Sequence, residues 1–283
     1  MTAPLIVPQL RFASKRLATG PLAHYAEQGD PSGEVLLLLH GYTGSWFSFS
    51  RLLPLLPARY HAYALSQRGH GDSERPAGGY TIDHFAADVA AFLDAVGAAR
   101  ATLVGHSLSS LIARRVAETR PERVARLVLI GAIATPVNAA VLELRDFVRR
   151  LTDPVPEAFV REFQASTIHV PVPGPFFERA VAESLKLPAR VWQAVADGFC
   201  AFDDAADLGR IAAPTLILWG ERDAYFPGEE QKRLAGAIPG ARLTVYADTG
   251  HGPHYERPDR VAADLEAFLG GAQPSPAGGG VNR

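Results

Sequence analysis

The sequence has little of what marks several classes of protein. It contains a single cysteine among 283 residues, so no disulfide can form within the chain. This residue, Cys200, has no evident partner base, and we expect a small buried apolar side chain rather than a nucleophile. Charge is nearly balanced, with a net charge of -2 at pH 7. Binding to nucleic acid or to an anionic membrane calls for a basic excess, so the composition favours neither partner.

Long hydrophobic runs are also missing. No apolar stretch approaches the roughly 20 residues that a membrane-spanning helix needs. The opening residues, MTAPLIVPQLRFASKR, lack the basic start and long apolar run of a signal peptide. We therefore expect a cytoplasmic protein with no membrane partner. The sequence leaves the oligomeric state open.

What the sequence does contain is a series of short apolar runs rich in Val, Leu and Ile. Four of them are almost continuously apolar, which is typical of strands buried on both faces of a parallel sheet. The predicted strands are 35–41, 60–67, 101–107, 126–131, 215–220 and 242–248.

Amphipathic patterns between these runs predict helices at 81–97, 108–121, 228–239 and 258–271. Strand and helix alternate, so the fold class is α/β, with a mostly parallel sheet flanked by helices. The first 30 residues are expected to add one or two antiparallel edge strands.

The alternation breaks in the middle of the chain. Residues 135–213 contain helical segments cut by prolines and rich in aromatic residues, and we interpret them as a helical cap inserted into the core. The predicted organisation is a core formed by 1–134 and 214–270, the cap 135–213, and a disordered tail, 271–283, rich in glycine and proline.

A serine follows one of the predicted strands directly, in the stretch LVGHSLSS. Ser107 lies between Gly105 and Ser109, which is nearly the Gly-x-Ser-x-Gly pattern of a tight strand-to-helix turn that exposes a nucleophile. The alternative is that Ser107 only caps the helix. Ser109 stands where the pattern has glycine, and we expect its hydroxyl only to fill the turn.

Partners elsewhere in the chain favour the nucleophile. His40-Gly41 ends a buried strand, so the next amide, that of Tyr42, can join the amide of Leu108 as an oxyanion hole. The alternative is that this His-Gly pair simply ends the strand, and we take His40 itself as structural.

An acid and a base complete the set. Asp223 lies just beyond a buried strand, and its rivals are Asp203, Asp204, Asp207 and Asp248. The loop 131–138, another place for such an acid, contains no acidic residue. His251 lies in a glycine-rich loop after the last strand and is the favoured base, with His254 as the alternative. The order Ser107, Asp223, His251 is the chain order of the α/β-hydrolase architecture.

Five segments carry a clear resemblance to the α/β-hydrolase superfamily: HGYTGS, QRGHGDSERP, VGHSLSS, PTLILWGERD and GHGPHYERP. They occur in the family's order, and the resemblance covers residues 20–269. It implies Ser107 as nucleophile, Asp223 as acid, His251 as base and the amides of Tyr42 and Leu108 as oxyanion donors. It also implies that RGHGDS is a structural loop. Relatives such as haloalkane dehalogenases and epoxide hydrolases use an aspartate at the position of Ser107.

The expected function is hydrolysis of a carboxylic ester or lactone through an acyl-enzyme, with no cofactor and no metal. The composition of the cap predicts a largely apolar small-molecule pocket. Four aromatic residues are candidates for its lining, although aromatic residues in helices more often belong to the core: Trp46, Phe47, Trp192 and Tyr225. Two alternatives stay open, namely carbon–carbon bond hydrolysis or elimination on the same residues, and a slow-turnover binding protein or receptor.

Overall fold

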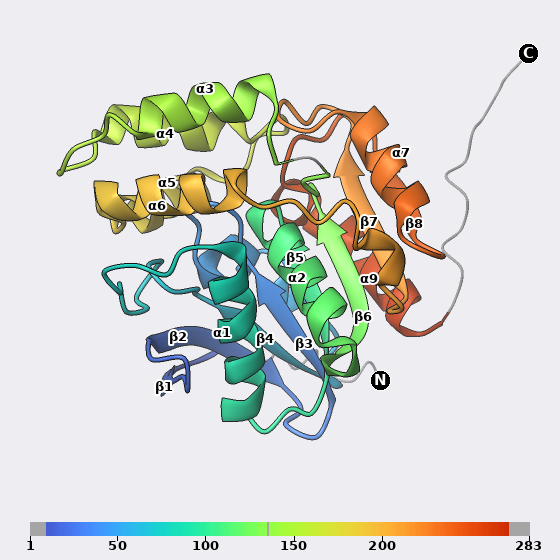
Figure 1. Ribbon diagram of the computed structural model, residues 1–283. Helices are drawn as coiled ribbons and strands as arrows, with labels where there is room; N and C mark the ends of the chain where they lie inside the picture. The colour runs from blue at the N-terminus through green and yellow to red at the C-terminus, as the bar shows by residue number, and fades with distance from the viewer. Residues whose placement is uncertain (1–9, 135, 272–283) are drawn as a thin grey trace, which may run out of the picture.

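A single eight-stranded sheet forms the centre of the molecule in the computed structural model, which describes residues 10–134 and 136–271 (Figure 1). The strand order is β1-β2-β4-β3-β5-β6-β7-β8. β3 to β8 run parallel to one another, while β1 and β2 are antiparallel to their neighbours at one edge. This arrangement confirms the predicted α/β class and its antiparallel edge strands.

The six predicted parallel strands match the observed ones to within two residues. The strands are β1 (Arg11–Arg16), β2 (Leu22–Gly29), β3 (Glu34–Leu39), β4 (Tyr60–Leu65), β5 (Ala101–His106), β6 (Val124–Ile130), β7 (Thr215–Gly220) and β8 (Arg242–Tyr246). The α-helices are α1 (Ile82–Ala95), α2 (Leu108–Thr119), α3 (Ala139–Val148), α4 (Glu157–Ser166), α5 (Gly174–Leu185), α6 (Ala189–Cys200), α7 (Gly228–Ala237), α8 (Pro253–Glu256) and α9 (Pro258–Leu269).

Both faces of the sheet are buried, and β3 shows this most clearly. Leu37 and Leu39 pack into a core with α1, α2 and α7, whereas Leu36 and Leu38 pack into a second core with α9. Successive side chains of a strand point to opposite faces. The continuous apolar run of β3 is therefore what a strand between two helical layers requires.

Helices α3 to α6 all lie between β6 and β7 in the chain and form a layer across one end of the sheet (Figure 1). This layer covers the carboxyl ends of the parallel strands. Arg114 of α2 pairs with Asp204 beyond α6 at 2.7 Å and donates to the carbonyl of Ile133 beyond β6 at 2.6 Å. One fully buried guanidinium thus joins both ends of the layer to the core.

Two further observations concern the chain as a whole. Among the described residues, none of the helices has both the length and the apolar character required to cross a membrane. The predicted tail lies outside the described residues, apart from Gly271.

Candidate active site

Ser107 occupies a strained turn between β5 and α2. Its backbone has φ 51° and ψ −117°, a conformation that costs on the order of 1–3 kcal/mol for a residue with a side chain. The Ser107 amide donates to the carbonyl of Ile130 at 2.9 Å, which ties the turn to the neighbouring strand β6. Although Ser107 occupies the N-cap position, its side chain makes no capping hydrogen bond. The hydroxyl is therefore free for another partner.

Two glycines permit this turn. A Cβ on Gly105 would lie 2.2 Å from the carbonyl oxygen of Ser109, so any side chain there would collide with the helix start. A Cβ on Gly41 would lie 2.8 Å from Nδ1 of His106 and 3.1 Å from Cβ of Ser107. The loop after β3 consequently passes directly beside the serine.

A chain of hydrogen bonds links three side chains from distant parts of the sequence. The Ser107 hydroxyl lies 2.8 Å from Nε2 of His251, and Nδ1 of His251 lies 2.8 Å from a carboxylate oxygen of Asp223. The other Asp223 oxygen accepts from the amides of Tyr225 and Phe226, at 2.9 and 3.2 Å. The Asp223 side chain is fully buried and that of His251 is 6% exposed. A carboxylate held in this way fixes the imidazole with Nε2 toward the hydroxyl.

The rival acids and the rival histidine have other partners. Asp204 pairs with Arg114, Asp207 pairs with Arg210 at 2.8 Å, and the Asp203 carboxylate accepts from the amide of Ala205. Asp248 is exposed and pairs with Arg222 at 3.2 Å. His254 is fully buried with Nε2 3.2 Å from the Ser48 hydroxyl, and none of these five residues contacts the Ser107 hydroxyl through a hydrogen bond.

Tyr42 and Leu108, whose amides are the expected oxyanion donors, line the same cavity as Ser107. Tyr42 follows Gly41, which closely approaches Ser107, and Leu108 is the first residue of α2. Neither amide donates a hydrogen bond to any residue within 10–134 or 136–271. The first amides of a helix have no partner within it and carry the positive end of the helix dipole, so this place suits an oxygen that gains negative charge.

Ser109 connects the two segments that carry these amides. Its buried hydroxyl donates to the carbonyl of His40, and the Gln67 side chain donates to the Ser109 hydroxyl at 2.9 Å and to the same carbonyl at 3.1 Å. His40 itself is buried; it donates from Nδ1 to the carbonyl of Gly41 at 2.8 Å and accepts from the amide of Gln67 at 3.1 Å. The Ser109 hydroxyl therefore does more than fill the turn, because it bonds α2 to the end of β3. His40 has contacts of a structural residue.

The loop that carries His251 is held by the helical layer as well as by the core. The amide of His251 donates to the carbonyl of Thr167 at 3.1 Å. The buried carboxylate of Glu256 accepts from the amides of Val170 and Gly250, at 2.7 and 2.9 Å. The imidazole is thus positioned by residues on both sides of the site.

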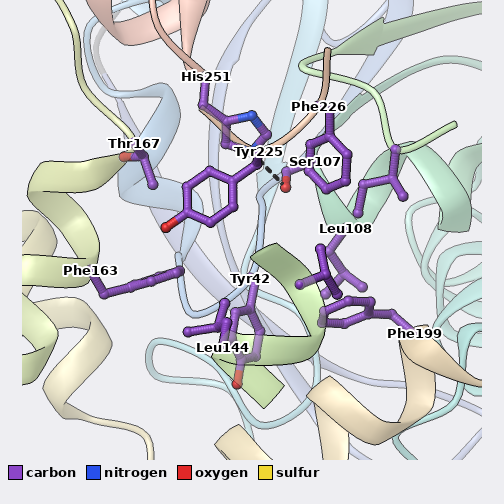
Figure 2. Close-up of a pocket in the computed structure, with 12 residues that line it drawn as sticks. Tyr42, Ser107, Leu108, Leu144, Phe163, Thr167, Phe199, Tyr225, Phe226 and His251 are labelled. Carbon is purple, nitrogen blue, oxygen red and sulfur yellow. Dashed lines mark hydrogen bonds between the residues drawn. The ribbon is translucent and has the colours of Figure 1, made fainter. Parts of the chain in front are cut away.

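A cavity opens beside the serine, between the strand ends and the helical layer (Figure 2). Rings and branched side chains surround the Ser107 hydroxyl in this view. Its lining is almost entirely apolar beyond the Ser107–His251 pair: Tyr42, Leu108, Ile133, Val141, Leu144, Phe163, Thr167, Phe199, Tyr225 and Phe226. An uncharged apolar group fits such a cavity.

The four aromatic candidates lie in different places. Tyr225 lines the apolar cavity, where its ring lies 5.7 Å from that of His251. Phe47 lines an outer cavity that does not include Ser107 or His251. Trp46 is buried in the core on the α9 side of the sheet, where its ring lies 4.8 Å from that of Phe12. Trp192 is fully buried behind Tyr42, whose hydroxyl donates to the Trp192 carbonyl at 2.7 Å. These two tryptophans are packing residues, not part of the described cavity linings.

Several lining residues had no signal in the sequence. Leu144, Phe163 and Phe199 belong to three different helices of the layer, and nothing in their local pattern shows which apolar residues face the serine. The polar residues Thr167 and Gln164, at the end of α4, also line cavities without any local sequence pattern that indicates this. Only the arrangement of α3 to α6 over the sheet identifies them.

Candidate metal ligands are not grouped in the described part of the chain, where no cluster of three or more His, Cys, Asp or Glu side chains could hold an ion.

The loop RGHGDS makes structural contacts. Arg68 forms a paired contact with Asp88, with both distances 2.6 Å, and Ser73 donates to the carbonyl of Ser66 at 2.6 Å.

Comparison with known proteins gives a consistent family. Residues 34–258 match the family model of the alpha/beta hydrolase fold, and the chain belongs to this family. A non-heme haloperoxidase of Rhodococcus erythropolis is 33% identical over 260 residues, covering 84% of this chain and 93% of the relative. A Variovorax paradoxus protein provisionally named a carbamate hydrolase, RutD, is 35% identical over 249 residues, or 81% and 88% of the two chains.

Among solved structures, a protein from Burkholderia cenocepacia provisionally named an aryl esterase superposes with a TM-score of 0.81. It is 26% identical, and the match covers 92% of this chain and 98% of that chain. The expected superfamily and fold are confirmed. The names of these relatives describe different reactions, so the reaction of this chain has to be argued from its own site.

Proposed function

We propose that this protein is a serine hydrolase that cleaves a carboxylic ester or lactone through an acyl-enzyme. The observation that carries the proposal is the unbroken path from the Ser107 hydroxyl through His251 to the buried carboxylate of Asp223, with both distances 2.8 Å. A serine hydroxyl is a weak nucleophile until a base accepts its proton. Here the base is in contact and its other nitrogen is fixed.

In the proposed first half-reaction, Nε2 of His251 takes the Ser107 proton while Oγ bonds to the substrate carbonyl carbon. The carbonyl oxygen becomes an oxyanion, which the amides of Tyr42 and Leu108 stabilise. Asp223 holds the tautomer and stabilises the imidazolium that forms. When the intermediate collapses, the bond to the alcohol oxygen breaks and His251 returns the proton to that oxygen.

In the second half-reaction His251 takes a proton from water, and the resulting oxygen nucleophile attacks the acyl carbon. The bond to Ser107 Oγ breaks, His251 gives the proton to Oγ, and the acid leaves. Every proton is accounted for by Ser107, His251 and water. The proposed reaction uses no cofactor.

The helical layer α3–α6 acts in this proposal as the predicted cap. It supplies Leu144, Phe163 and Phe199 to the apolar cavity, which supports a substrate with an apolar group next to the ester. The similarity to the Burkholderia cenocepacia protein provisionally named an aryl esterase points in the same direction.

A panel of substrates tests the reaction. Wild-type protein and Ser107→Ala are assayed with aryl and alkyl esters, lactones and vinylogous diketones. We expect turnover of an ester or lactone by the wild type only. Turnover of the diketones alone would favour carbon–carbon bond hydrolysis, and a bound but unturned ester would favour a binding protein. Equal turnover by Ser107→Ala would contradict the proposed nucleophile.

A further inference from the structure

A second cavity meets the apolar one at Ser107 and His251. This second cavity has more polar lining residues than the apolar one. The second is lined by Gly41, Gly44, Ser48, His106, Gln164 and Tyr255 in addition to residues it shares with the first. It adjoins an outer cavity, to which Ser48, Gln164 and Tyr255 also contribute.

Ser48 lines both of these cavities, and the partner of its hydroxyl comes from a distant part of the chain. Its hydroxyl lies 3.2 Å from Nε2 of His254, a residue 206 positions away in the chain. His254 is fully buried, and its ring lies 4.7 Å from Phe49 and 4.5 Å from His106. Burial, with the charge of His251 as a smaller cause, lowers the pKa of His254 to about 3, so the ring is neutral at neutral pH.

A neutral imidazole carries one proton, and the surroundings of His254 decide where it lies. Nδ1 has no hydrogen-bond partner among the described residues, whereas Nε2 faces the Ser48 hydroxyl. A proton on Nδ1 would leave a buried donor unpaired, which is a costly state. With the proton on Nε2, Nδ1 is an unpaired acceptor instead, and an unpaired buried N–H donor is the rarer of the two states. We therefore place the proton on Nε2, from which it is donated to Ser48 Oγ.

This tautomer determines what Ser48 presents to the cavity. A hydroxyl has one hydrogen to donate, and the bond from His254 uses one of its acceptor positions. The Ser48 hydrogen then has no acceptor among the described residues, and it belongs to a half-buried side chain that lines both cavities. The site offers a donor to an oxygen of the ligand.

The carboxylate that lines the outer cavity is paired with two cations. Glu183 lines the outer cavity, and its carboxylate is paired with Arg179 at 2.7 Å and with Lys186 at 3.1 Å. The Gln164 amide group is uncharged and donates to the Ser184 hydroxyl at 2.9 Å. A charged ligand group would find no free counter-charge among these residues, so an uncharged one fits.

We propose that the cavity lined by Ser48 and Gln164 binds an uncharged, oxygen-bearing arm of the substrate, with the Ser48 hydroxyl donating to an ether, hydroxyl or carbonyl oxygen. This inference rests on the proposed ester hydrolysis and specifies its substrate class. The ester has one apolar arm, which enters the cavity under α3 and α6, and one oxygenated arm, which lies beside Ser48.

Two matched pairs of esters test the subsite on either side of the reacting carbonyl. On the alcohol side, 2-methoxyethyl hexanoate is compared with butyl hexanoate; on the acyl side, butyl 3-methoxypropanoate is compared with butyl pentanoate. Within each pair an ether oxygen replaces a methylene. The ratio of kcat/KM values within a pair, compared between wild type and variant, cancels the intrinsic reactivity of the esters.

We expect Ser48→Ala to lower kcat/KM for the methoxy member of one pair by about tenfold, the usual size of one neutral hydrogen bond, and the hydrocarbon member by less than about twofold. Ser48→Thr keeps the hydroxyl and should keep the preference. Ser50→Ala removes a hydroxyl two residues further along, outside both cavities that Ser48 lines, and should leave the ratio unchanged.

Equal loss on both members of both pairs would mean that Ser48 only supports the fold, and no loss on any member would mean that no substrate oxygen binds there. Either result overturns the subsite while ester turnover continues. Failure of the proposed function is a different outcome, in which the wild type hydrolyses no ester and Ser107 does not react with an alkyl phosphonate. Melting temperatures of the variants identify a loss caused by unfolding.

Discussion

The carboxyl end of the sheet and the helical layer that covers it contribute to the site in different ways. The sheet end provides every group that the proposed chemistry uses: Ser107 after β5, Asp223 after β7, His251 after β8, and the amides of Tyr42 and Leu108. The layer α3–α6 provides apolar side chains to the cavity and polar contacts to the His251 loop. The comparison suggests that reactivity resides in the first region and substrate selection in the second.

The largest effect is expected from the sheet end. Ser107→Ala or His251→Ala should lower kcat by roughly 10⁴-fold or more, because either change removes the proton path to the nucleophile. Steady-state assays with an aryl ester measure this. His254→Ala should retain far more activity, since His254 contacts Ser48 rather than Ser107. If the two histidine variants lost activity equally, the assignment of the base would fail.

The acid is tested by two matched substitutions. Asp223→Asn should lower kcat on the order of 10³- to 10⁴-fold, because an amide supports the wrong imidazole tautomer. Asp248→Asn, at an exposed residue paired with Arg222, should stay within about twofold of the wild type. The pair is compared in the same aryl ester assay. A larger loss for Asp248→Asn would show that the acid lies elsewhere.

A smaller effect is expected where the two amide-bearing segments are joined. Ser109→Ala removes the hydroxyl that donates to the carbonyl of His40, and Ser109→Gly also restores the residue typical of the turn. Both should lower kcat by about three- to tenfold with KM unchanged, the size of one buried neutral hydrogen bond. Ser110→Ala is the control, since its hydroxyl accepts from the Ile133 amide at 2.9 Å instead. Unchanged kcat for Ser109→Ala would leave this hydroxyl as a space-filling group.

The helical layer should alter selection instead of reactivity. Leu144→Phe narrows the apolar cavity, so kcat/KM should fall several-fold for esters with a large apolar acyl group and stay within about twofold for acetates. Competition between a long and a short acyl ester measures the change directly. A uniform loss over all acyl lengths would mean that the layer takes part in reactivity. Reactivity and substrate selection would then not be divided between the sheet end and the layer.

The smallest effect concerns Glu118, a residue of α2 that lies close to Asp204, where the helical layer joins the core. Burial, together with the negative charge of Asp204, raises the pKa of Glu118 to about 7. The folded state then binds the Glu118 proton more tightly than the unfolded chain, where the pKa is near 4.5, so stability falls as pH rises from about 4.5 through 7.

Glu118→Gln removes this dependence. Its melting temperature should exceed that of the wild type by about 2–4 °C at pH 8, and the gain should shrink toward pH 5. Glu122→Gln, at an exposed acid nearby, should show no such difference. An equal gain at both pH values would contradict the raised pKa.

The same division explains how much the sequence alone could predict. The parallel strands were predicted to within two residues because runs such as VLLLLHG are apolar on both faces. Ser107 follows such a run directly, and Asp223 and His251 lie in the loops that follow β7 and β8. The placing of β4 between β2 and β3 leaves no local pattern. The lining residues of α3 to α6 and the Ser48–His254 contact depend on packing between segments far apart in the chain, so local periodicity could not identify them.

The central claim is that Ser107 is the nucleophile, and trapping the enzyme with a covalent inhibitor tests it most directly. The protein is treated with an alkyl 4-nitrophenyl phosphonate, and the modified peptide is located by mass spectrometry. The account predicts one phosphonyl group per chain, on Ser107, with loss of ester hydrolysis in proportion to labelling. Full labelling of another residue, or complete hydrolytic activity after labelling of Ser107, would contradict it.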